Sequence, residues 1–203
     1  MPAVKTPVET AVAVWKPVLI RALVAAIFGI STIFLRHPEV SLLKYGVAAY
    51  LVFSGTAMWE YLRREPVPEA MRGPLSMAAA AWMVGAIVLL FLSDTVVIAW
   101  VAAAALALGG VAELVAWARH RREFVPARDQ LYTGLVGVGT AVGLLLFQHL
   151  DPHGLLGIIG GGAIIIAVVM AISGFGFRHD AGSEADSPAS GGFPGGGAED
   201  RSR

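Results

Sequence analysis

Residues 154–177 read GLLGIIGGGAIIIAVVMAISGFGF, a run without a charged side chain. The hydrocarbon core of a bilayer takes about 17 to 25 helical residues, so this run is long enough to cross it. In lipid a backbone must satisfy its own hydrogen bonds, and runs of this length form helices rather than the barrel strands of about 10 residues. The sequence predicts an all-α, polytopic membrane protein with six transmembrane helices, near residues 18–35, 42–62, 75–92, 96–117, 131–149 and 154–177.

The composition supports the same class. The chain has 203 residues, of which 56% are hydrophobic and 15% charged, and its mean hydropathy is +0.69. A soluble domain has no place for so much apolar surface, so the lipid bilayer is the expected partner. The 15 basic and 15 acidic residues balance, which argues against nucleic acid as a partner. There is no cysteine, which excludes disulfides, thiolate metal sites and thiol catalysis.

The chain divides into three parts. Residues 1–16 are predicted to be a cytoplasmic N-terminal segment, residues 17–178 the membrane domain, and residues 179–203 a disordered cytoplasmic tail rich in Gly, Ser, Pro and acid. Thirteen of the 15 Lys and Arg residues fall on the side that holds both termini; the other two are Arg36 and Lys44. By the positive-inside rule we expect a multi-pass membrane protein with both termini cytoplasmic.

Three helical hairpins, at about 17–64, 72–122 and 128–178, are predicted to be one repeated unit. When the chain is shifted by 56 and then by a further 58 residues, small residues fall into the same two columns. Small residues four apart lie on one helix face and let two helices approach closely. The predicted packing residues are Ala25, Gly29, Ala81, Gly85, Gly139 and Gly143. Such stripes serve contacts within and between chains, so a homo-oligomer or another membrane protein stays open as a partner.

The first hairpin, RALVAAIFGISTIFLRHPEVSLLKYGVAAYLVFSGTAMWEYLRR at 21–64, has Gly29 in its first helix, Pro38 at the turn, Gly55 late in the second helix, and Arg63 and Arg64 at the end. This pattern resembles the repeat of the HdeD-like acid-resistance membrane proteins. The resemblance covers about residues 16–178. The second copy departs from it with Asp94 in place of Pro, and the third lacks the late Gly at the matching position. The resemblance implies a small bacterial inner-membrane protein linked to acid stress.

The turns between the two helices of each hairpin are predicted to face outward, and they hold the candidate pH-responsive residues His37, Glu39, Asp94, His149, Asp151 and His153. Histidine titrates near pH 6.5 and carboxylates near 4, so acid makes this face positive. Alternatively, these are ordinary helix ends, where Asp94 and Asp151 accept hydrogen bonds from the free N–H groups of the next helix. The stretch HLDPH at 149–153 also offers ligand types that bind zinc. Nothing in the sequence brings the turns together, so no metal site and no cofactor is predicted.

The ionisable residues within the predicted spans are Arg21, Glu60 and Glu113, all near the cytoplasmic ends. Charges there are a functional hypothesis by default. Arg21 is expected either to reach Glu60 or to extend into the headgroups. No charge sits at the midplane, where a transport path needs one, so transport is disfavoured. Trp82 and Trp100 lie deeper and are expected to pack within the bundle.

Catalytic motifs are missing from the sequence. There is no Gly-rich phosphate loop, nucleophile elbow or H-E-x-x-H, so no catalytic residue is predicted and the protein is not expected to be an enzyme. The favoured hypothesis is a non-enzymatic membrane protein of the HdeD-like type, linked to acid or envelope stress through a titratable outer face. The alternative is a small transporter or channel with a pH-responsive mouth.

Overall fold

The computed structural model describes residues 7–35 and 38–182, and within them the chain forms six α-helices and no strand. Each helix is long and apolar enough to cross a membrane, so all six predicted spans are confirmed. Large apolar side chains such as Phe34, Phe91 and Ile172 are exposed on the outside, as lipid contact requires. The chain is therefore a multi-pass integral membrane protein. The helices are α1 (Val8–Phe34), α2 (Val40–Leu62), α3 (Glu69–Leu90), α4 (Thr95–His120), α5 (Ala127–Leu146) and α6 (Pro152–Gly182).

Two helices extend beyond the predicted membrane domain. Helix α1 begins at Val8, so most of the predicted N-terminal segment that the structure describes is helical. Helix α6 continues to Gly182, so residues 179–182 are helical, whereas residues 183–203 of the predicted tail lie outside the described residues. The two extensions support each other, because Ala11 and Val14 of α1 are fully buried and the Arg178 guanidinium lies 5.8 Å from the centre of the Trp15 ring.

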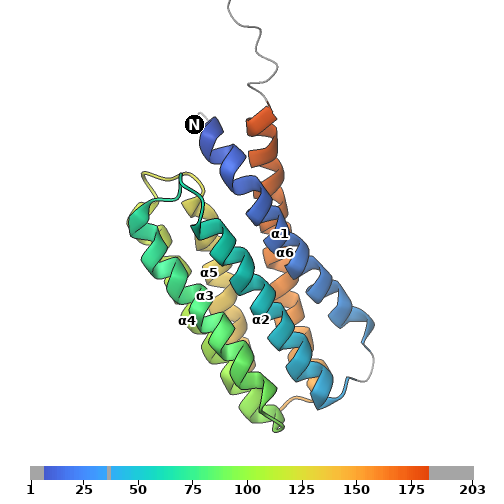
Figure 1. The fold of residues 1–203 in the computed structure, drawn as a ribbon. Coiled ribbons are helices and arrows are strands. Elements are labelled where there is room, and N and C mark those ends of the chain that lie inside the picture. The colour runs from blue at the N-terminus through green and yellow to red at the C-terminus, as the bar shows by residue number, and fades with distance from the viewer. Residues whose placement is uncertain (1–6, 36–37, 183–203) are drawn as a thin grey trace, which may run out of the picture.

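The six helices run up and down, so both described ends of the chain lie at one end of the bundle (Figure 1). We call this the termini end; it also carries the α2–α3 and α4–α5 turns. The opposite end, with the α1–α2, α3–α4 and α5–α6 turns, is the hairpin end. The most extensive contacts join α1 to α6 and α4 to α5, with α3 between α2 and α4. The three predicted hairpins are therefore not equivalent in packing, since α3–α4 packs more extensively than α1–α2 or α5–α6.

Glycines allow close contacts between helices. A Cβ added to Gly29 of α1 would lie 2.9 Å from the carbonyl oxygen of Gly160 in α6. Gly110 of α4 and Gly134 of α5 face each other in the same way, with an added Cβ on either 2.8 Å from the carbonyl oxygen of the other. In lipid, van der Waals contact between closely approaching backbones replaces the missing hydrophobic drive. The two most extensive interfaces thus depend on backbone surfaces without side chains.

The predicted small-residue columns do not all lie at such contacts. Ala25 is buried, and Gly85 faces Ala105 of α4 across the α3–α4 contact. Gly143 lies near Ile158 of α6, and Ala81 is half-buried. Gly139 is exposed, and an added Cβ there meets no atom within 4 Å, so it serves no helix contact among the residues that the structure describes. The columns follow one helix face, but the neighbours of that face differ from hairpin to hairpin.

Replacing Gly110 tests the glycine contact between α4 and α5. We expect Gly110→Ala to destabilise the protein by about 1 to 3 kcal/mol, because the new methyl group meets a backbone carbonyl that cannot rotate away. Thermal unfolding of the purified protein in detergent, followed by circular dichroism, measures the change. Gly139→Ala is the matched control and should be neutral or slightly stabilising, since alanine is the better helix former. Equal losses in the two variants would contradict this account of the packing.

Candidate functional site

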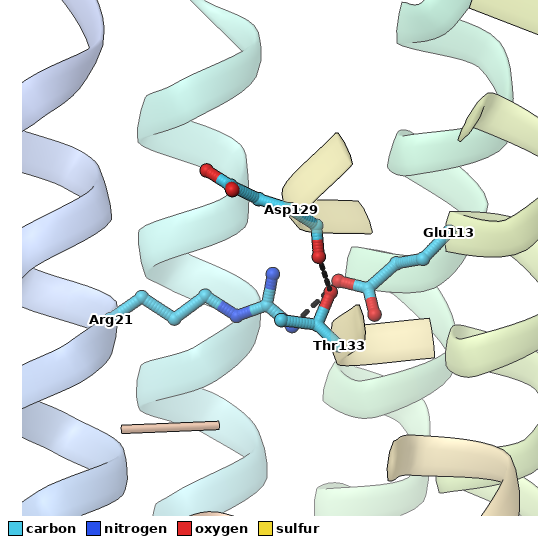
Figure 2. A network of polar contacts seen from close by, with 4 residues as sticks. All are labelled: Arg21, Glu113, Asp129 and Thr133. Carbon is cyan, nitrogen blue, oxygen red and sulfur yellow. Dashed lines mark hydrogen bonds and ion pairs between the residues drawn. The ribbon is translucent and has the colours of Figure 1, made fainter. Parts of the chain in front are cut away.

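A buried ion pair crosses the interior of the bundle near its termini end. Nη2 of Arg21, from α1, lies 2.6 Å from Oε1 of Glu113, from α4, and the two side chains are only 6% and 1% exposed. Figure 2 shows the arginine side chain extending from α1 toward the carboxylate, with α5 residues beside it. Helices α1 and α4 make no extensive contact of their own, so the pair links two helices that the packing otherwise keeps apart.

Both alternatives expected for Arg21 are wrong, because it neither pairs with Glu60 nor extends into the headgroups but is buried against Glu113. The Glu60 side chain is 46% exposed and lies 3.8 Å and 4.0 Å from the guanidinium nitrogens of Arg63 and Arg64 at the end of the same helix. Glu113 precedes the end of α4 by seven residues, about 10 Å at 1.5 Å per residue, so the pair lies within the membrane-spanning part of the bundle. A charge at this depth is stable only beside an opposite charge, whereas Glu60 can reach the polar surface.

Trp82 of α3 covers the arginine. The Arg21 guanidinium carbon lies 4.9 Å from the centre of the indole ring, a cation–π contact inside the protein. The ring fits because Gly109 of α4 has no side chain at the place that the indole occupies. Trp82 is buried, as expected, but Trp100 is not: it is 52% exposed, and its Nε1 donates to Oε1 of Gln148 at 2.5 Å. Trp100 thus joins α4 to the end of α5 near the hairpin end.

Helix α5 adds polar residues that the sequence analysis missed. Asp129, Gln130 and Thr133 are all buried. The Thr133 hydroxyl donates to the Asp129 backbone carbonyl at 3.1 Å, and Oδ1 of Asp129 accepts the Ser173 hydroxyl of α6 at 2.7 Å. Asp129 and Gln130 fell just outside the predicted span, and so they were not considered. The signal that would have found them is the spacing of 129, 130 and 133, which places three polar side chains on one side of a helix.

Two small cavities flank Arg21. One is bordered by Arg21, Tyr61 and Gln130, and the other by Arg21, Trp82, Glu113 and Thr133, among others. Each measures about 10 Å³, the room that one water molecule needs. Among the described residues, the Tyr61 hydroxyl, Trp82 Nε1 and Gln130 Oε1 are buried without a hydrogen-bond partner. Such atoms are costly in an apolar interior, which makes their surroundings chemically unusual for a membrane bundle. We call this group of buried side chains the polar cluster: Arg21, Tyr61, Trp82, Glu113, Asp129, Gln130 and Thr133.

The polar cluster does not continue to the hairpin end. Of the buried polar side chains in the described residues, only Thr32 lies in that half, and its hydroxyl donates to the carbonyl of Gly29 in its own helix at 2.7 Å. An apolar pocket of about 420 Å³, between α1 and α2, opens in the same half and is lined by residues such as Phe28, Leu42 and Phe53. In this conformation no charged path runs from one end of the bundle to the other through the described residues.

At the hairpin end, two of the predicted pH-responsive residues act as helix caps. Oδ1 of Asp94 accepts the backbone N–H of Val97 at 2.9 Å, and Oδ1 of Asp151 accepts that of Gly154 at 3.0 Å. The helix-end interpretation is thus confirmed for both carboxylates. Glu39 precedes α2 without capping it through its side chain, and its Oε2 accepts the Ser41 hydroxyl at 3.3 Å.

The structure describes two of the three candidate histidines of the hairpin end. His149 and His153 are exposed on either side of Asp151, and His37 lies outside the described residues. No group of three or more His, Asp or Glu side chains that could hold a metal ion occurs in the part of the chain that the structure describes. Comparison with protein-family models, curated proteins and solved structures finds no match to this chain.

Removing one partner of the ion pair should be strongly destabilising. We expect Glu113→Gln to lower stability by about 3 to 5 kcal/mol, because it leaves the Arg21 charge buried without a counter-charge. The double variant Arg21→Met with Glu113→Leu should recover much of that loss, since it removes both charges together. Thermal unfolding in detergent measures both, with Glu60→Gln as the control at an exposed carboxylate. A Glu113→Gln protein as stable as the Glu60→Gln protein would refute the assignment.

Proposed function

We propose that the protein is a non-enzymatic membrane protein of the acid- or envelope-stress type, whose hairpin end faces outward and responds to proton concentration. The observation that carries the proposal is the use of two carboxylates, Asp94 and Asp151, as helix caps at that end, with His149 and His153 exposed beside the second. The resemblance of residues 16–178 to HdeD-like proteins supports the link to acid stress. The excess of basic residues at the termini end supports an orientation with both termini in the cytoplasm.

Acid acts on the start of α6 in two ways at once. A charged carboxylate at an N-cap contributes about 1 kcal/mol, and a protonated one is a weaker acceptor. The charged form of Asp151 therefore caps α6 more strongly than the protonated form. His153 lies in the first turn of α6, where a positive charge opposes the helix dipole by about 0.3 to 1 kcal/mol. In the proposed function, loss of the negative charge on Asp151 and gain of a positive charge on His153 both weaken the hydrogen bonding at the start of α6.

Acid challenge of cells tests this function. A strain lacking the protein should survive acid less well than its parent, and the wild-type gene should restore survival. We expect Asp151→Asn to restore it poorly, because asparagine caps a helix about as well as aspartate but does not titrate. Immunoblotting of membranes controls for equal protein levels. Unchanged survival of the deletion strain would refute the acid-stress role.

Amide hydrogen exchange of the reconstituted protein then checks the physical step. After correction for the intrinsic effect of pH, exchange in the first turn of α6 should increase about fivefold on acidification, the equivalent of about 1 kcal/mol. The Asp151→Asn protein should show a smaller increase. An equal increase in both proteins would show that the Asp151 cap does not contribute to the response to acid.

A small transporter or channel is the second candidate, and the polar cluster is the observation that favours it. Buried charges and water-sized cavities of this kind occur along ion and proton paths in other membrane proteins. Here the cluster stops short of the hairpin end, so transport requires a second conformation that opens that half. The non-transporting function is the better supported of the two.

Flux measurements in liposomes separate these candidates. We expect proton flux through vesicles containing the protein to equal that of empty vesicles at pH 7 and at pH 5, because the apolar half of the bundle is closed. A pH-sensitive fluorophore inside the vesicles reports the flux. Acid-gated flux that disappears when His37, His149 and His153 are replaced by Ala would instead establish the transporter.

A further inference from the structure

A pocket of about 260 Å³ lies between α5 and α6 at the termini end. Its volume is close to the lower limit of roughly 300 Å³ for pockets that hold drug-sized ligands, so it suits a small group. Arg128, Asp129 and Tyr132 line it from the start of α5, and Ser173, Phe177 and Asp180 line it from the end of α6. It is separate from the hairpin end, on which the proposed function rests.

The pocket lies at the depth of lipid headgroups. Gly176, on its wall, follows the first residue of α6 by 24 positions, about 36 Å along the helix. The hydrocarbon core is about 30 Å thick, so a helix that enters the membrane near Pro152 reaches the opposite headgroup region at this point. Tyr132, on the wall of the pocket, is 45% exposed, and the same turns of α6 carry the exposed apolar side chains Ile172 and Phe175, as in a lipid-facing segment. A membrane lipid is therefore the molecule that has direct access to this pocket.

The charges in the pocket are mixed in sign. Arg128 supplies one positive charge, and Asp129 and Asp180 supply two negative charges. Asp129 is 93% buried, and while its Oδ1 accepts the Ser173 hydroxyl, its Oδ2 has no hydrogen-bond partner among the described residues. A buried carboxylate with an unpartnered oxygen favours a cationic donor nearby. A ligand that suits this set carries a donor-rich cation and an anion a short distance apart.

The walls leave room for such a ligand. A Cβ added to Gly176 meets no atom within 4 Å, so this side of the pocket is open space. Phe177 is buried at the back, and Val125 adds a second apolar surface. The polar groups thus lie in front of an apolar wall that the glycerol and first methylene groups of a lipid can contact.

We propose that this pocket binds the phosphoethanolamine headgroup of a membrane lipid. The phosphate pairs with the Arg128 guanidinium, and the primary ammonium donates toward the Asp180 carboxylate, with the negative charge of Asp129 behind it. A choline headgroup has no N–H to donate, and a glycerol headgroup has no cation, so both fit less well. The preference for phosphatidylethanolamine follows from the two carboxylates, and the preference for a lipid over a soluble amine follows from the lipid-facing position.

Native mass spectrometry of the full-length protein with defined lipids tests the proposal. Phosphatidylethanolamine should bind about tenfold more tightly than phosphatidylcholine or phosphatidylglycerol with the same acyl chains, as loss of one charge-assisted contact implies. Arg128→Gln and Asp180→Asn should each weaken phosphatidylethanolamine binding about tenfold. Gly176→Leu should abolish it by filling the open side without disturbing a helix contact.

Arg119→Gln and Glu123→Gln are matched controls, because both residues are exposed at the same end of the bundle and do not line the pocket. They should bind the lipid as the wild type does, and circular dichroism should show equal helix content in all variants. Equal binding of the three lipids, or unchanged binding by Arg128→Gln and Asp180→Asn, would overturn the proposal. Competition by soluble phosphoethanolamine at equal concentration would also overturn it, because the ligand would then be a soluble zwitterion.

Discussion

The burial of Arg21 is the constraint on which much of this structure depends. A guanidinium in an apolar bundle needs a counter-charge, and Glu113 of α4 supplies it at 2.6 Å. The pair therefore sets the register of α1 relative to a helix that it does not otherwise contact extensively. Trp82 covers the arginine only because Gly109 leaves room for its ring. Three helices, α1, α3 and α4, are thus tied to one charge or to the side chains that accommodate it.

The two halves of the bundle differ in the kind of side chains that are buried between their helices. Toward the termini end, buried polar residues on α1, α4 and α5 supply directional contacts. Toward the hairpin end the contacts are apolar and close, as where Gly29 approaches Gly160. Both kinds of contact specify which helices meet, and a close glycine contact also occurs in the termini half, between Gly110 and Gly134.

Several particular residues show how far the sequence could be interpreted alone. The helix-cap alternative for Asp94 and Asp151 is confirmed, because capping depends on neighbours three residues away in the chain. Neither alternative offered for Arg21, a contact with Glu60 or extension into the headgroups, was right, and Asp129 was overlooked. The partners of Arg21 and Asp129 lie 92 and 44 residues away, in helices whose positions the chain order does not reveal. The predicted packing of Gly139 is not found among the described residues, for the same reason. The sequence shows which residues share a helix face, but not which helix lies against that face.

The sequence by itself determined the class of protein, the six spans and the helix caps. Hydropathy, run length and local hydrogen bonding depend on residues close together in the chain. Over apolar runs of this length, a backbone in lipid satisfies its own hydrogen bonds by forming helices. Only the tertiary structure decided that α1 packs on α6, that Arg21 meets Glu113, and that α5 and α6 enclose a charged pocket. In a membrane every helix is apolar on several sides, so the apolar pattern does not tell one neighbour from another. Close glycine contacts and buried charges make that choice, and both are properties of helix pairs.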